Sequence, residues 1–361
     1  MPTRELLSRG TADPGGQNPA RDRVETTRRL HRRRWLGLAG VGALLLVAVA
    51  ASVALGAREL SLGTVVQALS DPDPGNNDHA VVLDLRVPRT VIGLLGGLAL
   101  GLVGALMQGL TRNPIADPGL LGINSGASLL VIVAITSFEV GNASGYVWFA
   151  FTGAAVAGLV VYGAASLGWE GVTPVKLALV GAAFTAVATS LITLVLLVDH
   201  STLQEYRFWA VGSLAGRSLD VVGVLAPFLV VGVVLALAAG RMLNVLALGD
   251  DLARGLGQSV AMGRLVVVVA VVLLSGSATS LIGPVAFVGL VVPHVGRAVV
   301  GPDYRWILPY SALLGALLLL AADVVGRMVV RPSEIEVGLV VAFLGAPVMM
   351  WLIRRSKAVS V

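Results

Sequence analysis

Long apolar blocks separated by short polar or proline-containing stretches run along almost the whole chain. A helix that crosses a lipid bilayer needs about 20 predominantly apolar residues, and ten blocks reach or approach this length. The blocks lie near residues 36–57, 90–110, 119–138, 147–168, 176–198, 219–240, 262–282, 284–300, 306–326 and 336–353. The eighth block is short, and only Gly283-Pro284 separates it from the seventh. The pattern therefore predicts an all-α polytopic membrane protein with ten transmembrane helices, give or take one.

The composition fits this class and removes several kinds of site. The chain is 56% hydrophobic and 13% charged, whereas a soluble domain is about 25% charged. It contains no cysteine, which excludes disulfides, thiolate metal sites and cysteine nucleophiles. His294, near the inner end of the eighth block, has no second histidine at helical spacing. We therefore expect a local hydrogen bond for His294, and neither a metal site nor a cofactor in the protein.

The N-terminal segment differs from the rest of the chain. Residues 1–34 are polar and show no apolar periodicity, which predicts a disordered cytoplasmic tail before a transmembrane domain over residues 35–357. Five arginines that are typical of a helix beginning in the cytoplasm precede the first block: Arg28, Arg29, Arg32, Arg33 and Arg34. Ten spans then leave both termini in the cytoplasm. Much of the net charge of +5 lies in this tail, so the charge does not indicate nucleic-acid binding.

A cleaved signal peptide is the alternative for the N-terminus. A basic segment precedes an apolar run there, as it does in secretory signals. The run from Leu36 to Ala57 is longer than the apolar core of a usual signal, and further apolar blocks follow it. These features favour a retained first transmembrane helix.

Small residues recur every four positions along the second block. Residues at this spacing share one face of a helix, and in lipid such a face permits close contact between two helix backbones. The predicted packing seam consists of Gly93, Gly97, Gly101, Ala105 and Gly109. Gln108, near the inner end of the block, must find a polar partner inside the bundle.

The segment Thr111-Arg112-Asn113-Pro114-Ile115-Ala116-Asp117-Pro118-Gly119 cannot continue the second helix. Each proline disfavours helical backbone in the residue before it, and asparagine and aspartate favour turns. From the residues alone, an ordinary loop between helices is the simpler interpretation. A rigid corner near the inner mouth is the functional one.

A polar segment with an amphipathic pattern lies between the sixth and seventh blocks, over about residues 241–258. Asp250 and Asp251 suit a helix N-terminus, where the backbone dipole is positive, and Leu252 and Leu256 share a face. Such a helix can dock another protein or lie on the membrane surface. The residues alone do not choose between these two.

Several arginines lie on the side opposite the positive-inside trend. Arg86 and Arg89 flank Pro88 just before the second block, and Arg327 follows the ninth block. They can be snorkelling anchors at the bilayer edge or donors to carboxylates of a partner. Asp323 lies four residues before Arg327. An ion pair at this spacing explains a carboxylate within the membrane more simply than a role in proton coupling does.

The eighth block contains Gly283-Pro284 and Gly289 with Pro293 in otherwise apolar surroundings. This pattern predicts a broken helix. In a membrane such a break is tolerated only where it packs against protein or faces a water-filled cavity.

These segments, in this order, closely resemble the FecCD-type permeases of ABC importers for ferric siderophores, haem and cobalamin. The resemblance extends from about Leu36 to Arg355 and rests on LDLRVPRT, GALMQGLTRNPIADPGLLGINSGAS, LNVLALGDDLARGLG, GPVAFVGLVVPH and the late GAP. Aspartate replaces glutamate at positions 250 and 251, and Glu336 stands where proline is usual. The siderophore branch of the family, in particular permeases for ferric catecholates, is the most similar.

The resemblance implies a type II ABC importer permease fold in the cytoplasmic (inner) membrane, paired with a second permease in a homo- or heterodimer. It implies that Arg86, Arg89 and Arg327 dock a periplasmic or lipoprotein substrate-binding protein. It also implies that two ATPase subunits contact the inner loop, through Leu246, Leu248, Gly249, Asp250, Asp251, Leu252, Arg254 and Leu256. The chain itself has no GxxxxGK[ST] phosphate loop, so ATP hydrolysis is assigned to separate subunits.

The expected function is transport of a ferric siderophore by alternating access, without catalytic residues. Small uncharged groups suit the path of a bulky chelate, and the candidates are Asn124, Ser125, Ser128 and Thr185. Haem and cobalamin are alternative cargoes. A different class, the ion-coupled secondary transporter, also uses broken helices but would need Asp323 as its coupling carboxylate. A purely structural membrane protein would need neither the outer arginines nor the inner loop.

Overall fold

The computed structural model describes residues 19–140, 143–167 and 172–357, and its regular elements in these ranges are all helices. Seven helical segments are long and apolar enough to cross a membrane, and three shorter apolar helices accompany them. These ten apolar helices of the described ranges are α1 (Pro19–Ala54), α4 (Val87–Thr111), α5 (Ile123–Phe138), α6 (Ala143–Ser166), α7 (Pro174–Val198), α9 (Leu219–Ala238), α12 (Val260–Ile282), α13 (Val288–Val300), α14 (Tyr304–Val329) and α15 (Val337–Lys357), of which α5, α13 and α15 are the shorter ones. Each overlaps one of the ten predicted blocks, so the all-α polytopic prediction is confirmed.

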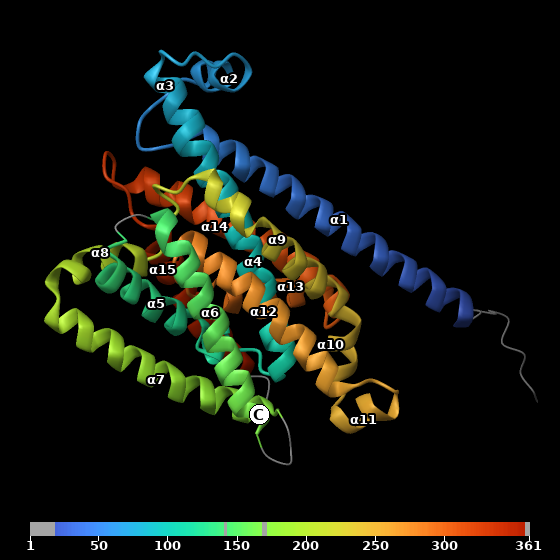
Figure 1. Ribbon diagram of the computed structural model, residues 1–361. Helices are drawn as coiled ribbons and strands as arrows, with labels where there is room; N and C mark the ends of the chain where they lie inside the picture. The colour runs from blue at the N-terminus through green and yellow to red at the C-terminus, as the bar shows by residue number, and fades with distance from the viewer. Residues whose placement is uncertain (1–18, 141–142, 168–171, 358–361) are drawn as a thin grey trace, which may run out of the picture.

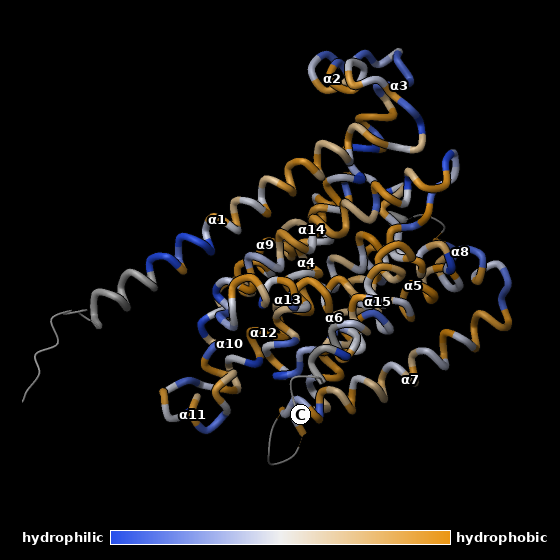
Figure 2. The backbone as a smooth tube through the Cα atoms, turned by 180° about the vertical axis from the view of Figure 1, so that it is seen from behind, coloured by the Kyte–Doolittle hydropathy of each residue, from blue (hydrophilic) through white to orange (hydrophobic). Residues whose placement is uncertain are grey.

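Short helices mark the two ends of the bundle (Figure 1). At one end lie α2 (Leu62–Ser70) and α3 (Asn77–Ala80), which a π-helical segment, Val81–Arg86, joins to α4. At the opposite end lie α10 (Gly240–Leu246) and α11 (Asp250–Gly255), and α1 begins at this same end. The helix α8 (His200–Ala210) follows α7. Figure 2 shows hydrophobic residues along the middle of the helices and hydrophilic ones at the ends, as a membrane protein requires.

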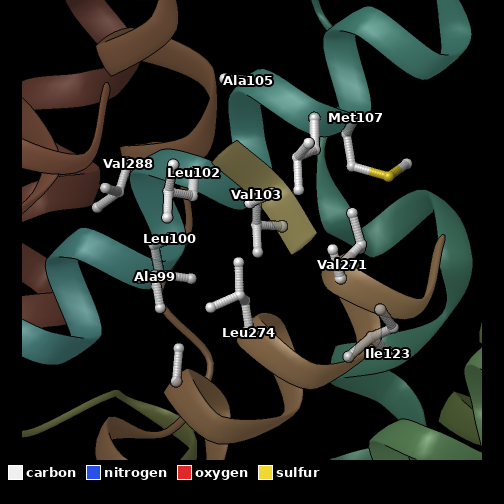
Figure 3. Close-up of a cluster of buried hydrophobic side chains, with 14 of the residues drawn as sticks. Ala99, Leu100, Leu102, Val103, Ala105, Met107, Ile123, Val271, Leu274 and Val288 are labelled. Atoms are coloured by element: carbon white, nitrogen blue, oxygen red, sulfur yellow. The ribbon is translucent and has the colours of Figure 1, made fainter. Parts of the chain in front are cut away.

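Helix α4 is the centre of the bundle and packs against α14, α12 and α13. Its side chains Leu102 and Val103 are fully buried and lie beside Leu274 of α12 and Val288 of α13 (Figure 3). By contrast, only 17% of the most apolar part of α1 or of α7 is buried. These two helices flank the bundle and leave apolar faces uncovered within the single chain.

Glycines on one face of α4 allow its backbone to touch that of α14. A Cβ atom at Gly101 would lie 2.0 Å from the carbonyl oxygen of Ser311, and one at Gly97 would lie 2.5 Å from that of Gly315. On a different face, a Cβ at Gly104 would lie 2.0 Å from the carbonyl oxygen of Gly289 on α13. Because apolar side chains gain little by leaving lipid, such close backbone contact is what holds membrane helices together.

Two other members of the predicted seam, Gly93 and Gly109, also face α14. Gly93 faces Leu320 of α14, Gly109 faces the ring of Tyr304, and Ala105 is fully buried. Gly104 was outside the seam predicted from the four-residue spacing. Its contact shows that α4 carries small residues toward two neighbours.

The predicted disorder of residues 1–34 is wrong for residues 19–34, because α1 begins at Pro19. Residues 1–18 lie outside the described part of the chain. Adding residues to an existing helix costs far less than nucleating a new one, and proline is favoured in the first helical turn. The apolar span therefore carries its polar N-terminal extension into the same helix.

The predicted break in the eighth block is confirmed. Helix α12 ends at Ile282 and α13 begins at Val288, and Gly283 and Phe287 have positive φ angles of 77° and 68°. The backbone N–H of Ser213 donates to the carbonyl of Ile282 (2.9 Å). The break is thus satisfied by protein groups, as membrane depth demands.

The turn after α4 is organised by its own side chains. The Oδ1 atom of Asn113 accepts the N–H of Ile115 at 3.1 Å, and the Oδ1 atom of Asp117 accepts that of Gly119 at 2.8 Å. Arg112 closes α4 with a left-handed φ of 50°. These local bonds replace the backbone bonds that the prolines remove.

Candidate transport sites at the two ends of the bundle

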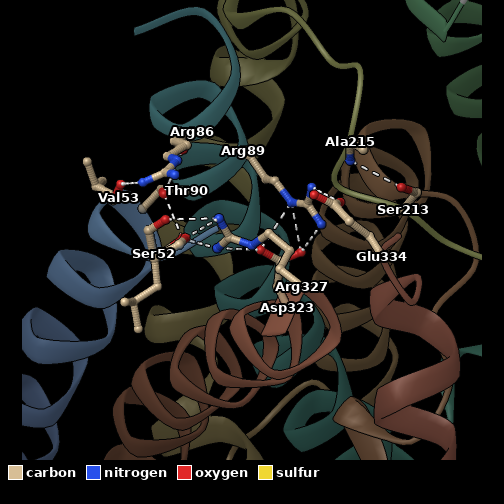
Figure 4. Close-up of polar contacts among 11 residues, drawn as sticks. Ser52, Val53, Arg86, Arg89, Thr90, Ser213, Ala215, Asp323, Arg327 and Glu334 are labelled. Atoms are coloured by element: carbon tan, nitrogen blue, oxygen red, sulfur yellow. Dashed lines mark hydrogen bonds and ion pairs between the residues drawn. The ribbon is translucent and has the colours of Figure 1, made fainter. Parts of the chain in front are cut away.

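The outer cluster consists of Arg86, Arg89, Arg327, Asp323 and Glu334 (Figure 4). The three arginines and Glu334 line one cavity of about 360 Å³. The arginines are only 4%, 8% and 2% exposed in the order given. The sequence-predicted arginines are therefore brought together, and each reaches the cavity from an otherwise buried position.

Arg86 is held by neutral backbone groups. Its Nη1 atom donates to the carbonyls of Val53 and Ala54 (3.0 and 2.6 Å), and its Nη2 atom donates to the carbonyl of Arg58 (2.6 Å). Val53 and Ala54 belong to the last turn of α1, whose carbonyls have no hydrogen-bond partner within the helix. Arg58 lies in the segment after α1. The guanidinium of Arg86 therefore keeps its positive charge uncompensated by any direct ion pair in the described chain.

Arg89 joins two carboxylates. Its Nε and Nη2 atoms donate to Oδ1 of Asp323 at 2.9 and 2.7 Å, while its Nη1 atom donates to Glu334 at 2.5 Å. The planar guanidinium is suited to such forked contacts. Arg89 thus ties α4 to α14 and to the segment before α15.

Arg327 completes the network. Its Nη2 atom lies 2.9 Å from Oδ2 of Asp323, so the predicted pair at four-residue spacing is confirmed. Its Nη1 atom donates to the carbonyls of Ser52 and Leu55 in α1 and after it (3.0 and 2.9 Å). Asp323, fully buried, is shared by two guanidiniums. No local pattern predicts the contacts of Ser52 with Arg327 and of Glu334 with Arg89, because Ser52 and Glu334 are distant in the chain from most of the cluster.

The inner cluster is centred on Asp250. This carboxylate forms ion pairs with Arg112, in the turn after α4, and with Arg264 of α12 (2.7 Å). Partial burial opposes ionisation, but the hydrogen bond from Arg112 and the charge of Arg264 outweigh it and lower the pKa of Asp250. Arg112 also donates from Nε to the carbonyl of Leu246 (2.8 Å). The turn at Arg112 is thereby attached to the start of α11.

Helix α11 and its flanks present leucines to the surroundings. Leu248, Leu252 and Leu256 are 58%, 61% and 65% exposed, whereas Leu246 is 2% exposed. Leu246, at the end of α10, thus faces the bundle and supports the surface from below, so that a contact between Leu246 and a partner stays a prediction. Gly249, with a φ of 110°, makes the turn between α10 and α11 that sequence analysis placed in the docking loop.

The remaining members of the predicted loop are at the surface. The side chain of Asp251 is 98% exposed and that of Arg254 is 64% exposed, and they pair at 3.2 Å. This pair lies on the helix surface, where an ion pair contributes little to stability.

A second carboxylate braces the same end of the bundle. Asp303 caps α14, accepts hydrogen bonds from Arg305 (2.8 Å) and Asn244 of α10 (2.6 Å), and lies 3.9 Å from Arg34 of α1. The pKa of Asp303 is lowered to about 2, mainly by the hydrogen bond from Arg305 and then by the hydrogen bond from Asn244. Three helices are tied together at this residue.

Three of the candidate path residues lie on α5, and the fourth, Thr185, lies on α7. Asn124 accepts a hydrogen bond from Thr279 of α12 at 3.1 Å, and Ser128, 6% exposed, bonds to Tyr206 of α8. Ser125 is partly buried on α5, and the Oγ1 atom of Thr185 on α7 is buried without a partner among the described residues. None of the four lines the outer cavity described above.

Two isolated residues behave as expected. Gln108 donates to the carbonyl of Gly289 at 3.2 Å and accepts from Arg297 at 3.1 Å, so it does find partners inside the bundle. His294 bonds through Nδ1 to the carbonyl of Leu290 at 2.9 Å. Within the described ranges, no group of three or more histidines, aspartates and glutamates is arranged to hold a metal.

The comparisons with known proteins agree with this architecture. The model of the FecCD transport family matches residues 44–355. The ferric enterobactin transport system permease protein FepD of Escherichia coli is 45% identical over 89% of this chain and 96% of its own length. The probable siderophore transport system permease protein YfiZ of Bacillus subtilis is 41% identical with the same coverage.

More distant relatives keep the fold. The hemin transport system permease protein HmuU of Yersinia pestis is 35% identical over 87% of this chain and 94% of its own length. A solved metal-chelate type ABC transporter in an inward-facing conformation superposes with a TM-score of 0.76 at 26% identity, covering 88% of this chain and 98% of that one. The family match over most of the chain shows that this protein belongs to the FecCD transport family.

Proposed function

We propose that the protein is the transmembrane permease subunit of an ATP-driven importer that carries a ferric siderophore across the cytoplasmic membrane by alternating access. The observation that carries this proposal is the family bundle with polar clusters at both ends, one beside an arginine-lined cavity and the other beside exposed leucines. The relatives named for siderophores support the cargo. A hemin permease among the relatives keeps haem as the second candidate.

At the outer end, the proposed partner is a periplasmic or lipoprotein substrate-binding protein. Arg86, Arg89 and Arg327 would receive its carboxylates, since guanidinium grips a carboxylate with two parallel hydrogen bonds. Arg86 is the best placed, because its present partners are neutral carbonyls. Glu334 already occupies one edge of Arg89, so an incoming carboxylate would compete with it.

At the inner end, the proposed partners are two ATPase subunits, one for this chain and one for a second permease. Leu248, Leu252 and Leu256 would supply the apolar contact. The ion pairs of Asp250 with Arg112 and Arg264 link this surface to α4 and α12. Movement of an ATPase would therefore reach the central helices directly.

An ion-coupled mechanism is less well supported. Asp323 is the carboxylate it would need, and this group is fully buried between Arg89 and Arg327. Its two ion pairs already account for this carboxylate within the chain.

The direct test is uptake in a strain that lacks this chain, compared with its parent, using radiolabelled ferric siderophores, haem and cobalamin. We expect selective loss of one ferric siderophore, restored by the intact gene. Loss of haem or cobalamin uptake alone would overturn the cargo. Uptake that continues when ATP is depleted but the proton gradient is kept would overturn the ATP-driven mechanism.

The docking roles need separate variants. Arg86→Gln should weaken capture of the binding protein, with Arg331→Gln as the matched outer control, because Arg331 pairs with Glu59 and lies outside the cavity. Leu252→Ser together with Leu256→Ser should abolish co-purification of the ATPase. Unchanged capture or co-purification would contradict the corresponding role.

A further inference from the structure

A second outer cavity, of about 400 Å³, lies beside the first. The two share Ala215 and Gly216, in the loop between α8 and α9. The second cavity is lined by Tyr146, Glu205, Phe208, Trp209, Ser213, Ala215, Gly216, Arg217 and Glu336. Its volume and its aromatic walls fall in the range of small-molecule sites, which combine apolar surfaces with a few placed polar groups.

Two buried donors on the wall of this cavity lack acceptors. Arg217 is 9% exposed, and its Nε and Nη1 atoms have no hydrogen-bond partner among the described residues. Trp209 is 2% exposed, and its Nε1 atom likewise has none there. The charge of Glu336 acts on Arg217, but no carboxylate of the described residues lies within ion-pair distance of it, and buried donors are ordinarily satisfied. The cavity therefore offers unused hydrogen-bond donors to a bound molecule that carries an acceptor.

The acidic groups on the same wall do not fill this role. Glu205 accepts a hydrogen bond from Tyr146 at 3.2 Å, and neither Glu205 nor Glu336 forms an ion pair with Arg217 in the described structure. They lie where a bound molecule could donate to them. The two glutamates would repel a simple anion. A ring that carries an oxyanion beside hydroxyl groups could accept from the donors on the wall and donate to the glutamates.

We propose that Arg217 and Trp209 form an outer binding subsite for an oxyanion-bearing aromatic group of the cargo. Arg217 and Trp209 donate to the oxyanion, Glu205 and Glu336 accept from neighbouring hydroxyl groups, and Phe208 and Tyr146 contact the ring. The subsite deepens the proposed import function and rests on it for the identity of the cargo. The subsite lies next to the arginine-lined cavity, where a delivered molecule would first meet the permease.

The test uses the full permease in lipid nanodiscs and three probes: 2,3-dihydroxybenzoate, benzoate, and benzamide as the neutral analogue. Titration calorimetry should give the order dihydroxybenzoate, benzoate, benzamide, from tightest to weakest. Arg217→Gln should weaken dihydroxybenzoate binding at least about tenfold, as expected for a charge-assisted hydrogen bond, and Arg217→Lys should restore part of the loss. Arg331→Gln is the matched control and should bind like the unmodified protein.

Several outcomes would overturn the subsite. Equal binding of benzoate and benzamide by the unmodified protein would overturn the subsite. This comparison needs no variant, so it remains a test if Arg217→Gln does not fold. Unchanged probe binding by Arg217→Gln would do so directly. A loss of cargo-free binding-protein capture in Arg217→Gln, with probe binding unchanged, would assign Arg217 to docking instead.

The proposed function is tested apart from the subsite, by uptake in cells that carry either the unmodified chain or the Arg217→Gln variant. If ATP does not drive uptake but the probes bind as expected, the import function fails and the subsite stands. If ATP drives uptake and Arg217→Gln alters neither uptake nor probe binding, the subsite fails and the import function stands.

Discussion

Both ends of the bundle carry arginine–carboxylate clusters, but the outer cluster is buried and the inner one is partly exposed. Asp323 is fully buried between two arginines, whereas the side chains of Asp250 and Arg112 are 28% and 36% exposed. Breaking a buried ion pair strands a charge. Near water the same pair contributes little and can be exchanged for contacts with a partner. The same chemistry therefore serves as a fixed clamp at one end and as an adjustable contact at the other.

The largest expected effect comes from removing the shared carboxylate of the outer cluster. Asp323→Ala leaves the buried Arg327 without its ion-pair partner and Arg89 with Glu334 alone, and we expect a loss of about 3–5 kcal/mol in the free energy of unfolding. Unfolding in mixed micelles with increasing denaturing detergent measures this. Asp251→Ala, at a side chain that is 98% exposed, is the control and should change stability little. Similar losses for the two variants would remove the contrast between the ends.

The next effect tests the helix that connects the two clusters. Arg89 lies in the first turn of α4 and Arg112 follows its last, so displacement of this helix should affect both ends. Gly101→Ala places a methyl group against the carbonyl of Ser311, and overpacking of this kind costs about 1–3 kcal/mol.

Gly40→Ala on α1 is the matched control, because nothing lies within 4 Å of the added atom. Replacing glycine by alanine in a helix is intrinsically favourable, so this control should be neutral or slightly stabilising. A loss at Gly40 equal to that at Gly101 would contradict the close contact between α4 and α14.

A smaller effect is expected at the inner cluster. Arg112→Gln removes one partner of Asp250 but leaves Arg264, and an exposed pair is worth about 0–1 kcal/mol. The difference from the unmodified protein should shrink further at about 1 M salt, where the screening length is about 3 Å. Unfolding measured at low and high salt tests this. A salt-independent loss as large as that of Asp323→Ala would show that the inner cluster is also a fixed clamp.

A pH-dependent effect is expected at Asp303. Its pKa is lowered from 3.8 to about 2 in the folded protein, so the folded state binds protons less readily than the unfolded one. The resulting stability is present above about pH 4 and is lost as the pH falls toward about 2. The stability difference between the unmodified protein and Asp303→Asn should therefore decrease over this interval in thermal unfolding. A difference that does not change with pH would contradict the hydrogen bonds from Arg305 and Asn244.

The sequence predicted that the outer arginines form a site, but it did not predict the residues that they contact. Arg86, Arg89 and Arg327 stand out because arginine is unexpected on that side of the membrane. Their partners come from α1, α14 and the segment before α15, and no periodicity links Ser52 or Glu334 to them. The loop after α8, which carries Arg217, is attached to α15 by a hydrogen bond from the N–H of Gly338 to the carbonyl of Gly212 (3.1 Å), and no periodicity predicts this contact either.

Local patterns determined much of this protein. The apolar blocks specify the ten helices, because a chain in lipid must satisfy its own backbone, and the spacing of Gly97 and Gly101 specifies the face through which α4 packs. Proline and glycine at 283–284 specify the break. The helical state of residues 19–34 was decided by the helix that follows them. Which side chains of distant segments meet was decided by tertiary packing, because ion pairs such as Arg89–Asp323 depend on the geometry of α4 against α14 and leave no mark in the order of residues.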